Sequence, residues 1–278
     1  MIDVLLATHR PNAAWLKEQI DSILSQKGVE INLIQREDVE GFGACGNFGA
    51  LLERSRADYV AFSDQDDVWL PEKLAISLEK IRELEMRWGK ETPLLVFTDA
   101  YVADSTLHVL GTNFSRQRIN VKSMSSFPRL MMQNFIPGNA MLFNAALRTK
   151  AGAIPRSAMM HDCWLAWVAI AFGHIGFVDS PLYYYRQHVS NVIGASRFSL
   201  GLVRKRFTEG RHEFRRRLEM NVRQAQAFVE RYRDSCPESV RVLATINGLT
   251  KFEKLYAITR YKLFKQGFLR NLALFLWC

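Results

Sequence analysis

The sequence has few cysteines and no long hydrophobic run. Its four cysteines are widely spaced, and they form no Cys-x-x-Cys pair and no mixed cysteine/histidine pattern. This spacing indicates neither a zinc site nor a disulfide framework, so a reducing compartment is expected. No run of about 18 apolar residues is present, so we expect no membrane-spanning helix. The cysteines are Cys45, Cys163, Cys236 and Cys278.

The sequence also lacks a basic n-region with a cleavage site at its beginning, internal repeats and low-complexity segments. The first residues instead have the pattern of a strand, so no signal peptide is expected. The chain has 278 residues, of which 48% are hydrophobic. This length and composition are sufficient for the core of one α/β domain and an appendage.

The most informative segment is a short apolar run followed by three carboxylates. Tyr59–Phe62 has the length and the aromatic and β-branched content of a buried strand, and Asp64, Asp66 and Asp67 follow it. Ligands bind at the carboxyl ends of strands in open α/β sheets. Three close carboxylates repel one another, and such oxygen ligands suit Mg²⁺ or Mn²⁺ shared with a substrate phosphate. The alternative is an acidic turn that caps a helix beginning near Pro71.

This acidic segment resembles the metal-binding aspartate motif of family 2 glycosyltransferases. The resemblance is closest to the bacterial branch that includes rhamnosyltransferases of surface polysaccharide assembly, and it covers most of residues 1–195. It is carried by Ser63–Trp69 and Pro71–Leu74. Four other segments are similar to this family in the same order: Val4–Thr8 to the first strand, Leu16–Gln26 to the first helix, His161–Trp164 to the acceptor-side motif, and Pro181–Leu182 with Tyr185–His188 to the closing segment.

The resemblance implies a GT-A-like α/β fold, with a mostly parallel sheet flanked by helices. It implies an inverting transfer of a sugar, rhamnose in the nearest branch, from a nucleotide diphosphate sugar to a saccharide or lipid-linked acceptor. Mg²⁺ or Mn²⁺ is expected on the donor diphosphate, because negative charge builds up on the leaving group. The expected location is cytoplasmic, peripheral on the inner face of the cell membrane.

The same resemblance assigns roles to individual residues. Asp66 is expected to bind the metal, and Asp64 the nucleotide or its ribose. Asp162, at the start of an apolar helix, is expected to deprotonate the acceptor hydroxyl, although aspartate is also favourable at a helix N-terminus. For His188 a structural role is the alternative, and for Trp164 it is core packing. The remaining expected contacts are Thr8 and Arg186 with the donor, His188 with the metal, and Gly138, Asn139 and Trp164 with the acceptor.

One segment departs from the family pattern. Similar enzymes have an acidic Asp-Asp-Gly-Ser-type turn after the second strand, then a helix and a third strand. Here Val29–Asp38 leads almost directly into Gly41–Gly43, so roughly one strand–helix unit is missing. Asp38 cannot be equated with the missing aspartate, and His9–Arg10 replaces the more usual Tyr-Asn after the first strand. The binding pocket is therefore either rebuilt, or the chain is a weakened or inactive variant.

The alternation of strands and helices favours a mostly parallel sheet covered on both faces. Residues 100–140 have an irregular pattern, with short strands as an option. The expected strands are Ile2–Ala7, a segment within Ile31–Gln35, Tyr59–Ser63, Leu94–Asp99, Ile175–Val178 and Tyr183–Arg186, and the expected helices are Ala13–Gln26, Cys45–Arg56, Pro71–Arg87, Leu147–Gly152 and His161–Phe172.

The positive charge is concentrated in the last third of the chain. Residues 196–278 contain 18 basic and 7 acidic residues, a net charge of +11, which leaves 19 basic and 21 acidic residues in 1–195. We therefore expect a glycosyltransferase domain over 1–195 and a basic helical tail over 196–278, with helices at Leu202–Asp234 and Lys251–Cys278. Basic amphipathic helices with aromatic residues suit an anionic membrane surface, and packing against the protein's own domain is the alternative. No motif for reading nucleic acid is present.

Two other functions remain open from the sequence. A nucleotidyltransferase also uses an acidic metal-binding turn, but it is expected to have a glycine-rich, basic phosphate loop near its N-terminus. Thr8–Pro11 is a poor match to such a loop. A non-catalytic, membrane-associated scaffold is the second alternative, because of the missing strand–helix unit.

Overall fold

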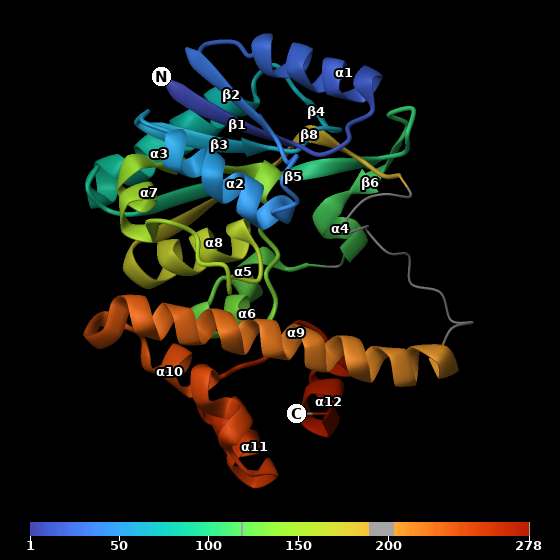
Figure 1. Cartoon of the computed structure of the whole chain (residues 1–278), viewed down its shortest axis with the longest axis vertical. Helices are drawn as coiled ribbons and strands as arrows, with labels where there is room; N and C mark the ends of the chain where they lie inside the picture. Colours follow the sequence, from blue (N-terminus) through green and yellow to red (C-terminus); the bar gives the residue numbers. More distant parts are fainter. Residues whose placement is uncertain (118, 189–202, 278) are drawn as a thin grey trace. The chain divides into compact units, whose positions relative to one another are not determined.

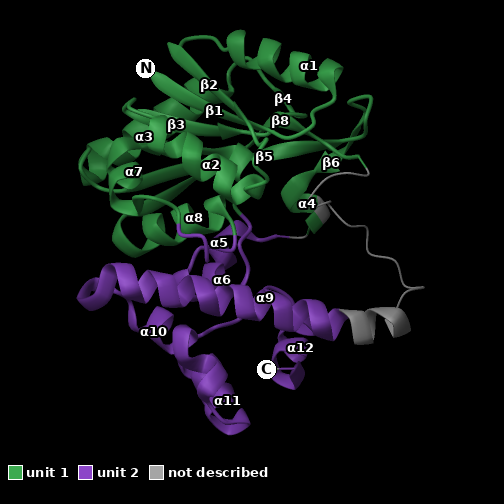
Figure 2. Cartoon of the chain, in the orientation of Figure 1, with its two compact units in different colours: residues 1–118, 136–154, 160–196 green, residues 119–135, 155–159, 197–278 purple. Residues whose placement is uncertain are grey.

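The computed structural model describes residues 1–117, 119–188 and 203–277, which fall into two compact units (Figures 1 and 2). Unit 1 comprises residues 1–118, 136–154 and 160–196, and unit 2 comprises 119–135, 155–159 and 197–278. The expected boundary at residue 195 lies outside the described residues. Unit 2 also takes in two internal segments, 119–135 and 155–159, that the sequence division placed in the first domain.

Unit 1 contains an eight-stranded mixed sheet in its described residues, with the order β2-β1-β3-β7-β5-β8-β4 and with β6 paired to β5. Strands β1, β2, β3, β5 and β8 run in one direction, and β4, β6 and β7 run against them. The predicted α/β class is confirmed. The strands are β1 (Ile2–Thr8), β2 (Ile31–Glu37), β3 (Tyr59–Ser63), β4 (Val68–Trp69), β5 (Leu94–Ala103), β6 (Val109–Thr112), β7 (Met141–Asn144) and β8 (His174–Arg186).

The helices of unit 1 pack around this sheet (Figure 1). Helix α2 packs on β1 and against α8, and α3 packs on β5, β7 and β8. Helix α1 begins at Asn12, whose side chain accepts hydrogen bonds from the amides of Ala14 and Trp15, as an N-cap residue does. These helices are α1 (Ala13–Leu24), α2 (Gly43–Arg54), α3 (Lys73–Trp88), α4 (Asn113–Gln117), α7 (Ala145–Ala151) and α8 (His161–Phe172).

Strands β1 and β3 determine where the acidic turn lies. They are parallel neighbours, with Leu6 paired to Ser63, so their carboxyl ends lie at the same edge of the sheet. All residues of β3 are buried, which explains its uninterrupted apolar sequence. Strand β2 is the outermost strand on this side, and the chain passes from β2 through α2 directly to β3. No further strand is paired beyond β2 in the described part of the chain.

Three expectations about secondary structure differ from the structure. Residues 174–186 form one strand, β8, with shifts of register near Pro181, where two strands were expected. Residues 100–140 contain short helices as well as the end of β5 and β6. The last segment is divided into two helices by residues 261–267, where Lys262 and Gly267 adopt positive φ angles of 55° and 91°. A positive φ ends a right-handed helix.

Unit 2 is helical in its described residues. Its core contains Phe228, Val240, Leu243, Ile258 and Leu274, each fully or almost fully buried. No helix in the described part of the chain is long and apolar enough to cross a membrane. The helices are α5 (Val121–Met124), α6 (Phe127–Met132), α9 (Val203–Tyr232), α10 (Glu238–Thr245), α11 (Lys251–Arg260) and α12 (Phe268–Trp277).

Candidate functional site

The structure brings Asp64 of the acidic turn close to both Asp66 and Asp162. The turn connects β3 to β4, and β4 pairs with the end of β8 in the same sheet. Burial, followed by the negative charges of Asp66 and Asp162, raises the pKa of Asp64 to about 7. Three predicted site residues from segments about 100 positions apart in sequence therefore form one acidic cluster.

Asp162 lies in the first turn of α8, and its carboxylate is held by backbone amides. It accepts hydrogen bonds from the amide of Cys163 at 2.6 Å and from that of Gly138. Burial raises the pKa of Asp162 to about 6, although these amides act in the opposite direction. A carboxylate that titrates close to neutral pH is suited to accept a proton as a general base.

His188 lies against the acidic turn at the end of β8. Its Nε2 is 2.6 Å from Oδ2 of Asp66, and its ring packs on Trp15 of α1 with 4.9 Å between ring centroids. The side chains of His188 and Asp66 are only 11% and 17% exposed. The two residues that were predicted to bind the metal are thus in direct contact.

Arg186 holds the backbone of the acidic turn by a hydrogen bond. Its Nε donates to the carbonyl oxygen of Asp66 at 2.9 Å, and its Nη1 donates to that of Ser105 at 2.7 Å. Nη2 is paired with the carboxylate of Glu18, and the guanidinium lies 5.2 Å from the ring centre of Trp15. Arg186 therefore orders the turn, and its contact with a donor stays a prediction.

Asp67, the third aspartate, belongs to a buried network. It is fully buried, and its Oδ2 accepts a hydrogen bond of 2.5 Å from Nδ2 of Asn139. The hydroxyl of Tyr183 in turn donates to Oδ1 of Asn139 at 3.0 Å. The ammonium of Lys73 lies 3.5 Å from the ring centre of Trp69, and burial lowers its pKa to about 7. This network anchors the base of the turn to α3 and β8.

Two residues that were predicted to contact the acceptor are buried in this structure. Asn139, in a short 3₁₀ helix (Gly138–Ala140), is 3% exposed because its amide serves Asp67 and Tyr183. Trp164 is fully buried, and its indole donates to the carbonyl oxygen of Ala151 at 3.2 Å. Trp164 therefore packs in the core, which was its alternative role in the sequence.

Gly138, the third predicted acceptor contact, is required by the close packing of His161. A Cβ atom on Gly138 would lie 2.5 Å from Nε2 of His161, so a larger residue here would force the buried imidazole to move. The His161 ring packs between Phe48 and Phe62, and burial lowers its pKa to about 3, so it is neutral. His161 therefore has a structural role. It packs beside Gly138, whose amide donates a hydrogen bond to Asp162.

Thr8 connects the end of β1 to the residues that follow β2. Its buried hydroxyl donates to the carbonyl oxygen of Arg36 at 3.3 Å, and its carbonyl oxygen accepts from the amide of Asp38 at 2.8 Å. The Asp38 carboxylate accepts hydrogen bonds of 2.8 Å and 2.7 Å from the amides of Phe42 and Gly43. Although burial opposes them, these amides lower the pKa of Asp38. Asp38 thus fixes the start of α2.

The donor set fits a divalent ion that is shared with a substrate. The described residues contain no group of three histidine, cysteine or acidic side chains arranged to hold a metal by themselves. Asp66 and His188 offer one oxygen and one nitrogen ligand at the same point. Mg²⁺ and Mn²⁺ commonly use one or two protein ligands and complete their coordination with substrate phosphates and water.

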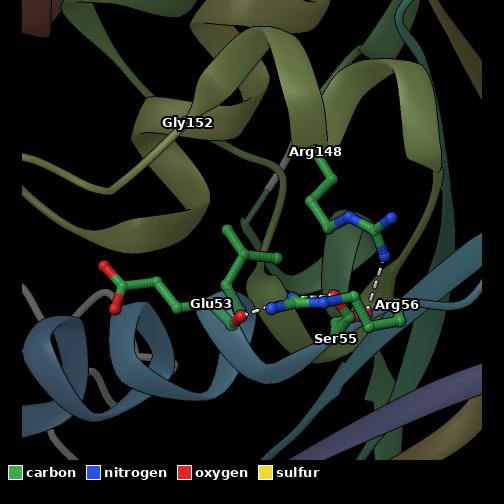
Figure 3. A pocket seen from close by; sticks show the side chains of 6 residues that line it. Glu53, Ser55, Arg56, Arg148 and Gly152 are labelled. Atoms are coloured by element: carbon green, nitrogen blue, oxygen red, sulfur yellow. Dashed lines mark hydrogen bonds between the residues drawn. The ribbon is translucent and has the colours of Figure 1, made fainter.

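A pocket lies beside the loop that precedes β3, and Figure 3 shows the side chains that line it. Arg148 donates to Oγ of Ser55 at 3.0 Å and to the carbonyl oxygen of Ala57 at 2.8 Å. These residues precede β3, whereas the acidic turn follows it. Arg56 and Arg148 hold the loop before β3 in place. The pocket is lined by Leu52, Glu53, Ser55, Arg56, Arg148 and Gly152.

Sequence reasoning missed several residues of the site. Trp15 and Glu18 lie one turn apart on α1 and contact His188 and Arg186. Lys73 lies within Pro71–Leu74, a segment that carries the family resemblance, but no role was assigned to it because its burial gave no signal in the sequence. A helix with an apolar and a charged residue three positions apart has the pattern of any surface helix.

Comparison with known proteins supports the class that the motifs predicted. No known family profile matches the chain. The dTDP-rhamnosyl transferase RfbG of Shigella flexneri is 23% identical over 239 residues, which cover 69% of this chain and 77% of that protein. This curated relative is a glycosyltransferase, in agreement with the motifs.

Two solved structures illustrate the similarity of the chain to known folds. S. aureus TarS has a TM-score of 0.49 and 15% identity, and the match covers 94% of this chain and 53% of that one. The chain thus spans about half the length of that TarS chain. The mannosyltransferase PcManGT of Pyrobaculum calidifontis, in complex with GDP-Man and Mn²⁺, has a TM-score of 0.48 and 13% identity, covering 99% of this chain and 78% of that one.

Proposed function

We propose that this chain is a metal-dependent, inverting glycosyltransferase that moves a sugar from a nucleotide diphosphate sugar to an acceptor hydroxyl. The observation that carries the proposal is the convergence of Asp64, Asp66, Asp162 and His188 at the carboxyl end of β3. This is the edge of an α/β sheet at which ligands bind. A metal ligand pair and a base are the two elements that this transfer needs.

The donor side of the proposed site is the acidic turn. Asp66 and His188 would hold Mg²⁺ or Mn²⁺, which stabilises negative charge on the leaving diphosphate when it is bound. Asp64 would contact the nucleotide or its ribose, and a carboxyl with a pKa of about 7 can do so either as donor or as acceptor. Arg186 keeps the Asp66 backbone in place.

The acceptor side is the first turn of α8. Asp162 would accept the proton of the acceptor hydroxyl as this oxygen attacks the sugar, and the amides of Cys163 and Gly138 orient its carboxylate. A single displacement from the face opposite the leaving group inverts the configuration of the sugar. This inverting displacement needs only one carboxylate as a base on the acceptor side.

The sugar, the acceptor and the location of the protein are proposed from RfbG, from the sequence and from unit 2. RfbG is a dTDP-rhamnosyl transferase, so we propose rhamnose as the sugar. We propose a lipid-linked saccharide as the acceptor, as the family resemblance of the sequence implies. We further propose that the protein acts on the cytoplasmic face of the cell membrane. The net charge of +11 in residues 196–278 supports this location. Several exposed apolar side chains support it too: Phe252, Tyr256, Phe268, Leu269, Leu272 and Leu276.

A screen of donors tests the proposal directly. The full chain is incubated with dTDP-rhamnose, UDP-GlcNAc or GDP-mannose, with Mn²⁺ or EDTA, and its thermal stability and the released nucleotide are measured. A donor at 100 times its Kd adds about 2.7 kcal/mol to the free energy of unfolding. We expect stabilisation by one nucleotide sugar only when metal is present, and release of a nucleoside diphosphate.

Two outcomes of this screen would contradict the proposal. Release of pyrophosphate from a nucleoside triphosphate and a sugar phosphate would identify a nucleotidyltransferase instead. No stabilisation by any nucleotide sugar, with or without metal, would favour a non-catalytic scaffold.

A further inference from the structure

One face of α9 meets the C-terminal helix inside unit 2. Gly210, Phe214 and Arg217 are spaced four and three residues apart, which places them on the same face of a helix. A Cβ atom on Gly210 would lie 3.6 Å from the Trp277 ring, and the rings of Phe214 and Trp277 are 5.7 Å apart. The part of this face that carries Gly210 and Phe214 is therefore packed on α12.

The turn before α12 brings a lysine to the same place. The amide of Lys265 donates to Oδ1 of Asn271 at 2.8 Å, and Nδ2 of Asn271 donates back to the carbonyl oxygen of Lys265 at 2.8 Å. These two hydrogen bonds fix the backbone of Lys265. Its ammonium lies 4.7 Å from the ring centre of Phe214, which is 7% exposed. The lysine ammonium therefore lies against a buried aromatic ring.

Two arginines lie close enough to repel this ammonium. Burial is the main cause that lowers the pKa of Lys265 to about 8, and the charges of Arg217 and Arg270 add to it. Among the described residues, no carboxylate forms an ion pair with Lys265 or Arg270. Arg217 has a partner, Glu213, but shares it with Arg216. The fold thus brings three cations together, and the one carboxylate paired with any of them, Glu213, already has a second partner.

An anion would relieve this arrangement. A partly buried ammonium without a counter-charge is unfavourable, and neighbouring positive charges make it more so. Two guanidinium groups and one ammonium are the donor set that proteins use for phosphate, because guanidinium binds two oxygens at once and the ammonium adds a point charge. The neighbours of Arg270 on α12, Phe268 and Leu269, are 79% and 65% exposed. The cluster therefore borders an exposed apolar surface.

We propose that Arg217, Lys265 and Arg270 form a binding site for a phosphate group. Two sources present this chemistry, the headgroup of an anionic lipid and a soluble phosphate ester. The exposed Phe268 and Leu269 favour the lipid headgroup, because they would enter the membrane interface beside it. The site lies wholly within unit 2, so it stands or falls independently of glycosyl transfer in unit 1.

The test compares site variants with a matched arginine on the same helix. R217Q, K265Q and R270Q are prepared in the full chain, with R223Q as the control. Arg223 is 64% exposed and pairs with Glu219 four residues before it, as Arg217, 62% exposed, pairs with Glu213. Binding is measured to phosphatidylcholine vesicles with and without phosphatidylglycerol. Removing a single surface charge weakens such binding about fivefold, and we expect each site variant to lose about tenfold or more.

A second arm identifies the source of the phosphate. Thermal stabilisation by inorganic pyrophosphate is measured for the wild type, K265Q and K265R. Stabilisation of the wild type and K265R but not of K265Q indicates a soluble phosphate ester, and selective loss of vesicle binding alone indicates a lipid headgroup. If K265Q fails to fold by circular dichroism, R217Q and R270Q test the site, because both arginines are exposed. Equal losses for R223Q and the three site variants, with no effect of pyrophosphate, would overturn the proposal.

Discussion

Nε2 of His188 lies 2.6 Å from Oδ2 of Asp66, although 122 residues separate them in sequence. This contact joins the end of β8 to the acidic turn after β3. Trp15 of α1 packs on the same imidazole, so three segments meet at this point. The tertiary structure therefore places the two proposed metal ligands next to each other.

The metal role of Asp66 predicts a specific loss in D66N. Asparagine keeps the size of the side chain but removes the charge that attracts a divalent ion, so Mn²⁺-dependent donor binding should be lost while the fold is retained. Calorimetric titration of the nucleotide sugar with Mn²⁺ measures this. The control is D58N, because Asp58 is exposed and precedes β3 at the opposite edge of the sheet. Unchanged donor affinity in D66N would refute the metal role.

The base role of Asp162 predicts slow turnover with intact donor binding. D162N should reduce kcat by roughly 10²- to 10⁴-fold, as expected for a general base. In the wild type, the rate should fall as the pH decreases below about 6, because the protonated carboxyl cannot accept a proton. The control is D179N, since Asp179 lies exposed on β8. Near-normal turnover in D162N would move the base to another residue.

The raised pKa of Asp64 predicts that D64N stabilises the metal-free protein. A carboxyl whose folded pKa of about 7 lies above its ordinary value of 3.8 contributes stability below pH 3.8, and this stability is lost as the pH rises through 7. At pH 8 the D64N variant avoids this loss, and an increase in Tm of roughly 2–4 °C for each kcal/mol gained is expected.

At pH 5 the gain from D64N should be smaller, because Asp64 is then protonated in the folded wild type. Calorimetry in EDTA at the two pH values measures the difference. A Tm increase that is the same at both pH values would show that the buried negative charge of Asp64 is not its cause.

The buried network predicts a large loss of stability in N139A. This change leaves Oδ2 of Asp67 and the hydroxyl of Tyr183 without their partner, and a buried polar group without a partner costs about 1–3 kcal/mol. N32A is the comparison, because Asn32 makes its hydrogen bond to Asp3 from an exposed position. Urea denaturation should show a clearly larger loss for N139A, and equal losses would contradict the role of the network.

The exposed side of α12 predicts vesicle binding that salt does not fully remove. Phe268 and Leu272 are 79% and 41% exposed, and burying such side chains contributes about 1.5–3 kcal/mol each. Replacing both by serine should remove the salt-resistant part of the binding to anionic vesicles. The part that depends on basic residues should remain at low salt and decay with the Debye length of about 8–10 Å.

M86S provides the control for that experiment, because Met86 is 82% exposed on α3 of unit 1. Full-length protein that does not bind anionic vesicles at low salt would contradict the membrane proposal, and the basic segment would then suit an acidic protein partner.

The elements with a strong local pattern were predicted from the sequence. Tyr59–Ser63 is a strand with the expected bounds, and His161–Phe172 is a helix with the expected bounds. Both are apolar runs flanked by residues that start or stop an element, so short-range sequence decides them. The same local patterns place Asp64 and Asp66 after a strand and Asp162 in the first turn of a helix.

The continuity of β8 and the use of Asn139 and Trp164 were decided by the tertiary structure. The local pattern predicts a break in the strand at Ser180–Pro181. Pairing with β5 nevertheless keeps residues 174–186 in one strand. Asparagine is a residue type that is common in surface turns. Asn139 is buried because its side chain forms hydrogen bonds with Asp67 and Tyr183. Burial depends on which distant segments pack together, and this information is not contained in spacing along the chain.

The sequence by itself thus determined the chemistry available to this protein: three carboxylates after one strand, a carboxylate at the start of one helix and a strongly basic last third. The tertiary structure decided which of these groups act together. It joined Asp66 to His188, turned Asp67 away into a buried network, and brought Lys265 close to two arginines. The reason is physical, since charge and hydrogen-bonding capacity belong to each residue, whereas distance and burial arise only when the chain folds.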